Sequence, residues 1–140
     1  MNLTFLFEEE KLARDVYLHF SDIYGAVIFS NIAASEQRHM DAVEGLLIKY
    51  KQAVPEPGDS LCVYNNTDLE TACWTLIAQG ETLVGALQSG VDIEVMDIED
   101  IELMMGETIK PDVIQVLGNL LDGSSNHLEA FTQSLNLLEL

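Results

Sequence analysis

The sequence is poor in basic residues, with six lysines and arginines against 24 aspartates and glutamates and a formal net charge of −18. A chain this acidic repels phosphate backbones and anionic lipid surfaces, so we expect neither nucleic acid nor a membrane as a partner. A high-salt environment, an attraction for cations, or a very soluble surface would each account for the charge. The soluble surface is the simplest of the three explanations.

Cysteines and long apolar runs are also scarce. The two cysteines, Cys62 and Cys73, form no CxxC pattern, which argues against a rubredoxin centre, a zinc knuckle or a disulfide scaffold. We expect two reduced, structural thiols. No run approaches the roughly 18 apolar residues of a membrane helix, and the N-terminus lacks the basic flank of a signal peptide. We therefore expect a soluble, cytoplasmic protein, unless a leader upstream of this sequence directs its export.

Strand patterns are nearly absent, whereas apolar residues recur at helical spacing over most of the 140 residues. The whole chain, residues 1–140, is predicted to form one all-α domain. Ser30 is the expected N-cap of the second helix, and Gly25, Gly80 and Gly106 are expected to end helices. The predicted helices span, approximately, residues 3–24, 31–51, 68–79, 82–105 and 111–137.

The longest predicted connection follows the second long helix. It includes the segment AVPEPGDSLCVYNN, which has two prolines, a glycine and paired asparagines, and then the short helix. Four long helices with two short joins and one connection of about 30 residues are typical of a ferritin-like bundle. The predicted fold class is therefore an all-α, ferritin-like four-helix bundle with a long crossover between helices 2 and 3 that carries a short extra helix.

Polar residues interrupt the apolar stripe of every long helix. A single buried acid or histidine is usually a structural residue with hydrogen-bonding partners, but interruptions in all four helices favour a common site. In the second helix the two interruptions lie three residues apart, so a carboxylate and an imidazole can reach one ion. Iron, manganese and zinc accept this ligand mixture. The interrupting residues are Glu10, Glu36, His39, Glu94, Asp97, Ser124 and His127.

Four segments of the sequence together resemble an uncharacterised domain family of ferritin-like proteins related to the rubrerythrins. They are EEEKLARDVY, SNIAASEQRHMDAV, IEVMDIEDIE and GSSNHLEAF, and the resemblance covers essentially the whole chain. It implies a metal site with a glutamate from each of helices one and three and a Glu-x-x-His motif from each of helices two and four. By position, the implied ligands are Glu10, Glu36, His39, Glu94 and His127.

Two features depart from this family pattern. Ser124 stands where helix four should supply a bridging glutamate, although Asp97 could provide the missing carboxylate. We therefore predict one tightly held ion per chain, with a second ion weak or absent. In addition, Glu10 and Glu36 lie at different distances from the turn that joins their helices. At about 1.5 Å per residue the difference corresponds to a stagger of about 12 Å, unless the segment GAVIF descends alongside the first helix.

Two further expectations concern the first helix. Of the three consecutive glutamates at positions 8 to 10, only Glu10 is expected inside the bundle, while Glu8 and Glu9 are expected to face solvent. Tyr17 is expected in the core, one step along the apolar stripe.

The leading functional hypothesis is a metal-binding protein that holds one or two ions per chain, with iron first and manganese or zinc as alternatives. The resemblance implies an oxidase or peroxidase that uses dioxygen or peroxide. Because no rubredoxin-type centre is present, electrons would come from an external donor protein. The alternative hypothesis is a helical bundle with a metal-free polar core that binds a partner. The sequence leaves a homodimer open, and iron storage would require a shell-forming oligomer.

Overall fold

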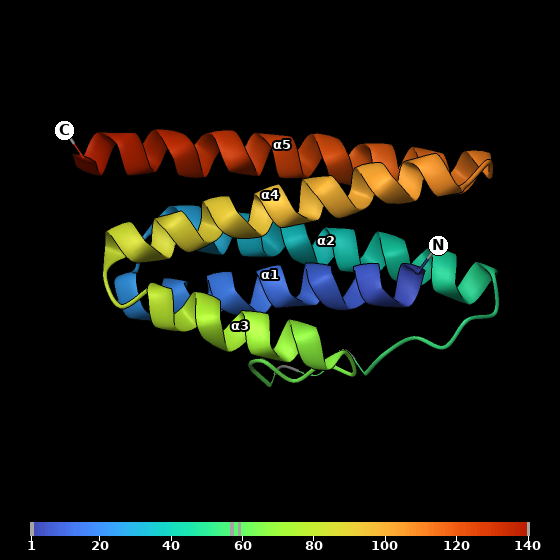
Figure 1. The fold of residues 1–140 in the computed structure, drawn as a ribbon, viewed down its shortest axis with the longest axis horizontal. Helices are drawn as coiled ribbons and strands as arrows, with labels where there is room; N and C mark the ends of the chain where they lie inside the picture. Colours follow the sequence, from blue (N-terminus) through green and yellow to red (C-terminus); the bar gives the residue numbers. More distant parts are fainter. Residues whose placement is uncertain (1, 57, 59, 140) are drawn as a thin grey trace.

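Long antiparallel helices form the body of the protein (Figure 1). The computed structural model describes residues 2–56, 58 and 60–139, and within these ranges it contains helices and no strand. None of the described helices is both long enough and apolar enough to cross a membrane. The helices are α1 (Leu3–Tyr24), α2 (Val27–Lys49), α3 (Thr67–Gln79), α4 (Leu83–Glu107) and α5 (Pro111–Glu139).

The four long helices form two antiparallel pairs that pack on each other. Helix α1 pairs with α2 and α4 pairs with α5, while further contacts join α1 to α4 and α2 to α5 (Figure 1). The short helix α3 lies outside this arrangement, against α1 and α4. The prediction of an all-helical bundle is therefore confirmed, whereas the kinship with ferritin-like proteins stays a prediction.

The ends of the helices agree with the sequence pattern in part. Gly25 ends α1 as predicted, with a φ of 62° and its N–H donating to the Ser21 carbonyl. The prediction for Ser30 is wrong, because α2 begins at Val27 and the Ser30 hydroxyl donates to the Val27 carbonyl inside the first turn. The prediction for Gly106 is also wrong. This glycine has no positive φ, so α4 passes through it to Glu107.

The apolar core consists of two clusters, one toward each end of the bundle. The cluster near the α1–α2 turn contains a series of rings, with neighbouring centroids 5.1 to 5.9 Å apart, formed by Tyr17, Phe131, Phe29 and Phe20. The other cluster contains Leu6, Met40, Ile101 and Leu117. Each long helix thus contributes apolar residues to both clusters, and the polar residues of its stripe lie between them. The two clusters separate this polar section from water at both ends.

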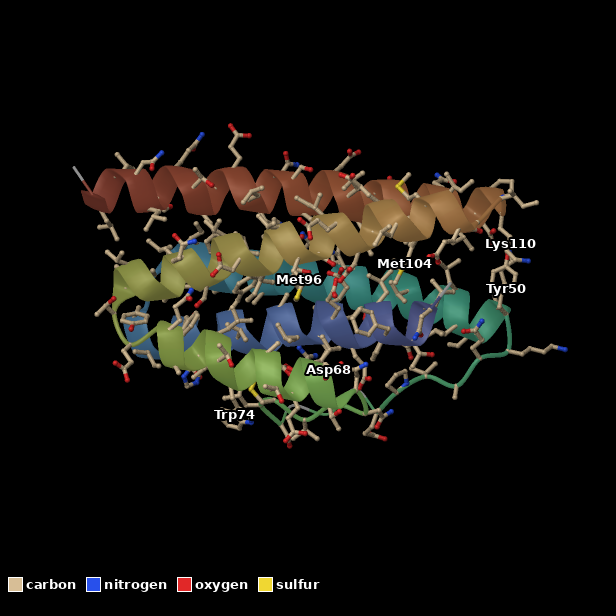
Figure 2. All side chains as sticks on the ribbon, viewed as in Figure 1. Tyr50, Asp68, Trp74, Met96, Met104 and Lys110 are labelled. Atoms are coloured by element: carbon tan, nitrogen blue, oxygen red, sulfur yellow. A yellow bond between two sulfur atoms is a disulfide. The ribbon has the colours of Figure 1, made fainter. Side chains whose placement is uncertain are left out.

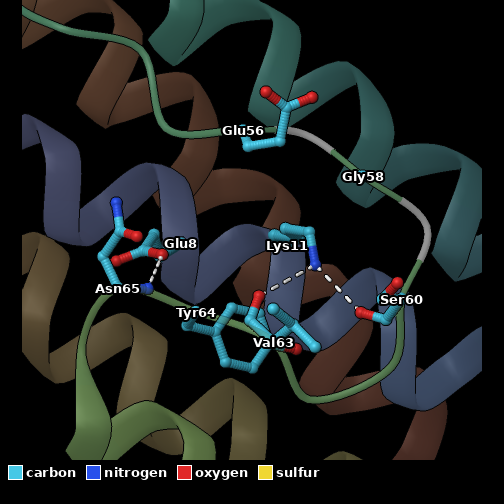
Figure 3. Close-up of a pocket in the computed structure, with 8 residues that line it drawn as sticks. All are labelled: Glu8, Lys11, Glu56, Gly58, Ser60, Val63, Tyr64 and Asn65. Carbon is cyan, nitrogen blue, oxygen red and sulfur yellow. Dashed lines mark hydrogen bonds between the residues drawn. The ribbon is translucent and has the colours of Figure 1, made fainter.

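The connection at residues 50–66 is attached to α1 by buried charges (Figure 3). Lys11 Nζ donates to the carbonyl oxygens of Ser60 and Val63, and Glu8 accepts a hydrogen bond of 2.6 Å from the N–H of Asn65. Glu8 is only 4% exposed. The prediction that Glu8 faces solvent is therefore wrong, because the connection covers its carboxylate and pairs it with backbone donors.

A disulfide bond attaches the same connection to α3. Cys62 in the connection and Cys73 on α3 are bonded, with their Cα atoms 5.5 Å apart. The prediction of two reduced thiols is wrong. It relied on the absence of a CxxC pattern, whereas this bond joins residues that meet because the connection folds back along α1 and α3. Tyr64 strengthens the attachment by donating a hydrogen bond of 2.9 Å to Asp15 on α1.

Candidate metal centre

Acidic and imidazole side chains from all four long helices meet in the polar section between the apolar clusters. Figure 2 shows oxygen atoms gathered in the interior, at about the middle of the bundle. The carboxylates of Glu10, Glu36 and Glu94 are fully buried, and Asp97 is 2% exposed. Burial on this scale follows from the position of each acid on the apolar stripe of its helix, which faces the other three helices.

The first group able to hold an ion consists of Glu10, Glu36 and His39. One ligand atom from each residue lies within 4.8 Å of the other two. His39 Nδ1 lies 3.2 Å from Glu10 Oε2 and 3.3 Å from Glu36 Oε2. The expected stagger therefore does not separate Glu10 from α2, in part because α2 begins a turn earlier than predicted.

The second group consists of Glu36, Glu94 and His127, again with ligand atoms within 4.8 Å of one another. His127 Nδ1 lies 2.9 Å from Glu36 Oε1 and 3.5 Å from Glu94 Oε1. The other ring nitrogen, Nε2, lies 3.0 Å from the hydroxyl of Ser35. When Nε2 donates its proton to Ser35, Nδ1 presents a lone pair to the two carboxylates.

Glu36 belongs to both groups and lies between the two histidines. Its Oε2 atom faces His39 and its Oε1 atom faces His127. The two imidazole rings are stacked, with centroids 5.7 Å apart. A carboxylate with one oxygen toward each of two ligand groups has the arrangement needed to bridge two ions.

Hydroxyl groups hold two of the carboxylates in place. Tyr17 donates a hydrogen bond of 2.5 Å to Glu94 Oε2, and Ser124 donates one of 2.7 Å to Asp97 Oδ2. Tyr17 is buried, as predicted. Asp97 belongs to neither three-residue group, but it lies in the same section, fixed by the serine that replaces the expected glutamate. Such hydrogen bonds orient ligands and adjust their basicity.

The absence of a side chain at Gly123 leaves room for the imidazole ring of His39. A Cβ atom at Gly123 on α5 would lie 2.7 Å from His39 Nε2, closer than real Cβ contacts come. The side of the ring opposite to Nδ1 therefore rests against the α5 backbone. Gly123 is a positioning residue for His39, and because it has no polar side chain, the interrupted apolar stripes of the sequence do not indicate it.

The carboxylates of the centre destabilise one another when charged. Burial is the largest cause that raises the pKa of Glu10, Glu36 and Glu94 above the ordinary value, and the charge of Asp97 raises all three further. For Glu94, contact with the His127 ring opposes this rise. Glu10 Oε1 and Asp97 Oδ1 are buried without a hydrogen-bond partner, whereas Glu36 Oε1 and Glu94 Oε1 face His127 Nδ1 at 2.9 Å and 3.5 Å.

Glu9 is a second buried acid on α1, so the prediction that it faces solvent is wrong. It is 1% exposed, and neither of its carboxylate oxygens has a hydrogen-bond partner. Burial raises its pKa strongly, and contacts with Asp100 and Asp97 on α4 raise it further. The apolar stripe predicted one buried side for α1, but α2, α3 and α4 all contact this helix. A helix covered on several sides also buries residues outside its stripe.

The fold and this cluster define an all-helical bundle with buried acidic and histidine groups that could hold a metal ion. The chain belongs to the family described as an uncharacterized protein domain (DUF2202), whose model matches residues 1–138. The uncharacterized protein MJ0754 of Methanocaldococcus jannaschii is 45% identical over 130 residues, which make up 92% of this chain and 70% of that protein.

A solved structure has the same fold. The crystal structure of the hypothetical protein MJ0754 from Methanococcus jannaschii DSM 2661 matches with a TM-score of 0.94 and 43% sequence identity, covering 98% of this chain and 79% of that chain. The similarity extends over both pairs of long helices and α3. The names of these relatives state no activity, so the function has to be inferred from the buried site.

Proposed function

We propose that this protein is a ferritin-like metal-binding protein whose ions lie on either side of Glu36. Iron is the first choice, and manganese and zinc are the alternatives. The observation that supports the proposal is the convergence of two groups of acids and histidines that share Glu36, each with ligand atoms within 4.8 Å of one another inside the bundle. Buried carboxylates are costly unless they are paired, and a divalent ion would pair several of them at once.

Five of the six proposed ligands divide into two sets that share Glu36, and Asp97, which belongs to neither set, adds a fourth carboxylate. Carboxylate and imidazole ligands together suit iron, manganese and zinc. The four carboxylates carry four negative charges when ionised, which equals the charge of two divalent ions. This balance favours two ions per chain over the single tight ion expected from Ser124, because Asp97 restores the missing carboxylate. The ligands are Glu10, Glu36, His39, Glu94, Asp97 and His127.

The same site supports an oxidase or peroxidase activity as part of the proposal. Iron bound there would supply one-electron transfer to dioxygen or peroxide. The chain contributes the positions of the ligands through the hydroxyls of Tyr17 and Ser124, and the apolar clusters at either end limit the access of water. The electrons needed to reduce the site again would come from an external donor protein.

Metal analysis of the purified protein tests the proposal. After anaerobic loading with ferrous ion and removal of loose metal with a chelator, we expect two bound ions per chain. Glu36→Gln should remove both ions, whereas Glu44→Gln, a change of a half-buried acid elsewhere on α2, should remove neither. Oxidation of the bound ferrous ion by peroxide, followed by absorbance, then tests the redox activity.

A folded wild-type protein without bound metal would overturn the proposal. That result would instead favour the alternative function, a helical bundle with a metal-free polar core that binds a partner. Loss of metal from the Glu44→Gln variant as well would contradict the assignment of the ions to Glu36.

A further inference from the structure

Two strongly exposed apolar side chains lie on either side of the end of α4. Leu103 on α4 is 66% exposed, and Ile109, in the turn that leads to α5, is 92% exposed. Figure 2 shows this end of the bundle, where Met104 lies on α4 and Lys110 follows the turn. Single exposed apolar residues are ordinary, but two of them close together at one helix end mark a candidate contact surface.

Each of these apolar residues has a charged neighbour, and the two neighbours have opposite signs. Glu102 precedes Leu103 and Lys110 follows Ile109, and both charged side chains are exposed. The Lys110 ammonium group lies 4.8 Å from the centre of the Tyr50 ring, a contact that favours its position at the end of the bundle. The surface therefore has an acid beside one apolar residue and a base beside the other.

Gly106 lies between these two halves of the surface and has no packing role inside the chain. It is exposed, it has no positive φ, and a Cβ atom there would meet nothing within 4 Å. Glycine within a helix is destabilising relative to alanine. A side chain is thus absent where the fold does not require its absence, which suits the close approach of a second backbone.

Two open hollows beside Leu103 combine apolar side chains with acids. The first has a volume of about 270 Å³ and is lined by Asn2, Phe5, Asp100, Leu103, Met104 and Glu107. The second, of about 500 Å³, is lined by Glu99, Glu102 and Leu103. Both hollows suit an apolar side chain followed by a lysine, which is the order of Ile109 and Lys110 in the turn.

The distribution of charge favours a second copy of this chain as the partner. Three of the six basic residues, Lys49, Lys51 and Lys110, lie at this end of the bundle around Tyr50. The chain as a whole has a net charge of −18, so two copies repel each other least where these lysines lie. Salt screens charges more than about 8 Å apart at physiological ionic strength, whereas it screens a pair within an interface much less.

We propose that the end of α4 is the contact surface of a homodimer, with a twofold axis near Gly106. Under this symmetry, residue i of one copy contacts residue j of the other, and the reverse contact forms as well. An axis between Leu103 and Ile109 brings these two residues together twice. The same axis brings Glu102 of each copy to Lys110 of the other. None of these residues belongs to the candidate metal centre, so the inference does not depend on the proposed function.

Sedimentation velocity over a range of protein concentrations tests the dimer. We expect a wild-type dimer with twice the 15.5 kDa mass of the chain. Glu102→Lys and Lys110→Glu should each raise the dissociation constant at least about tenfold, because like charges would then meet. The double variant pairs opposite charges again and should return to within about threefold of the wild type. The control is Arg38→Glu, which changes the net charge as Lys110→Glu does, at an exposed position in the middle of α2.

Each outcome supports or overturns the dimer. A wild-type protein that stays monomeric up to about 100 μM overturns it. A dimer that Lys110→Glu does not weaken, or that Arg38→Glu weakens equally, does not use this contact. A double variant as weak as the single variants would show that Glu102 and Lys110 do not meet, and assemblies that grow beyond the dimer would contradict the twofold axis. The substituted side chains are exposed, so the variants should keep the helical circular dichroism of the wild type.

Discussion

Adjacent residues of α1 belong to two groups of buried charged side chains. In the first group acids pair with basic or N–H groups, whereas the second group, which includes Glu9 and Glu10, consists of acids next to other acids. Glu8 accepts hydrogen bonds from the N–H groups of Asn65 and Asn66, and Lys11 forms an ion pair of 2.8 Å with Asp15. We call this group, with Arg14, the α1 clamp, because it attaches the connection to the helix. Glu9, one residue after Glu8, has two buried oxygens to which no basic or N–H group donates, and the aspartates that raise its pKa are acids as well. Both groups are removed from water, but only the α1 clamp contains charges of both signs.

The difference indicates that the two groups have different roles. Opposite charges in the α1 clamp, with their backbone partners, stabilise the path of the connection whether or not a ligand is present. The acids of the proposed metal site repel one another and lower the stability of the metal-free protein, an effect that a bound cation would reverse. Variants that alter one group should therefore respond differently to metal from variants that alter the other.

The largest effect is expected from Lys11→Met, which breaks the α1 clamp. The substitution leaves Asp15 with one charged partner fewer, and removing one partner of a buried ion pair costs about 3–5 kcal/mol. Urea denaturation should show this loss equally with and without metal. Lys49→Met is the control, because its ion pair with Asp112 is exposed and contributes little. A loss below about 1 kcal/mol for Lys11→Met would contradict a structural role for the α1 clamp.

A smaller effect, with a sign that depends on metal, is expected from Glu36→Gln. In the presence of metal, the unfolding free energy of the variant should be about 3 kcal/mol lower than that of the wild type. This is the stabilisation that a bound ion provides at a hundredfold excess over its dissociation constant, and the variant no longer binds the ion. The metal-free protein should gain about 1 kcal/mol, because glutamine is neutral without the proton that the buried Glu36, with its raised pKa, has to take up on folding. Thermal denaturation of both forms measures the two values. The same sign in both forms would show that Glu36 has a structural role only.

Gly123→Ala should weaken metal binding without lowering the stability of the metal-free helix. The new methyl group would displace the His39 ring, and misplacing a ligand costs about 10–100-fold in affinity. Gly118→Ala is the matched control on α5, since a Cβ there meets nothing within 4 Å. That variant should keep its affinity and gain up to about 1 kcal/mol from helix propensity. Equal metal affinities for the two variants, measured by competition with a chelator, would contradict the role of Gly123.

The smallest effect is a difference in how stability depends on pH. The pKa values of Glu10, Glu36 and Glu94 are raised in the folded protein, so the folded state binds protons more readily than the unfolded state. The metal-free protein should therefore become more stable as the pH falls from neutral toward the ordinary value of 4.5, by about 1 kcal/mol between pH 7 and pH 6. The metal-loaded protein should lose stability, because protons compete with the ion.

Unfolding curves recorded over this pH range, with and without metal, measure the difference. A metal-free protein that loses stability between pH 7 and pH 6 would show that other groups control its acid response. Parallel curves for the two forms would contradict the proposed competition between protons and metal.

The sequence located the acids and histidines of the centre because helical spacing alone places residues three or four positions apart on one side. The spacing alone does not establish that these residues converge, because that requires the apolar stripes of all four helices to face one interior. The structure shows this convergence through the contacts of Glu36 with His39 and His127. Their role as metal ligands stays a prediction. The spacing could not place Glu8 or Glu9, because burial outside the stripe depends on which other segments cover α1.

The connection at residues 50–66 was the part least predictable from the sequence. Its helical neighbours follow from apolar periodicity, but nothing in the pattern determines the path of a segment with two prolines and a glycine. The bond between Cys62 and Cys73 and the partners of Lys11 both depend on that path. The early start of α2 at Val27 was missed for a simpler reason, since Ser30 is a good N-cap by residue type but is not needed as one.

Anomalous X-ray diffraction from crystals of the protein loaded with manganese tests the central claim most directly. The claim is that Glu36 lies between two ions that pair the buried acids. We expect two anomalous peaks inside the bundle, one next to His39 Nδ1 and one next to His127 Nδ1, with a carboxylate oxygen of Glu36 toward each. Anomalous density confined to surface carboxylates, with the interior empty and the acids still in place, would contradict the claim.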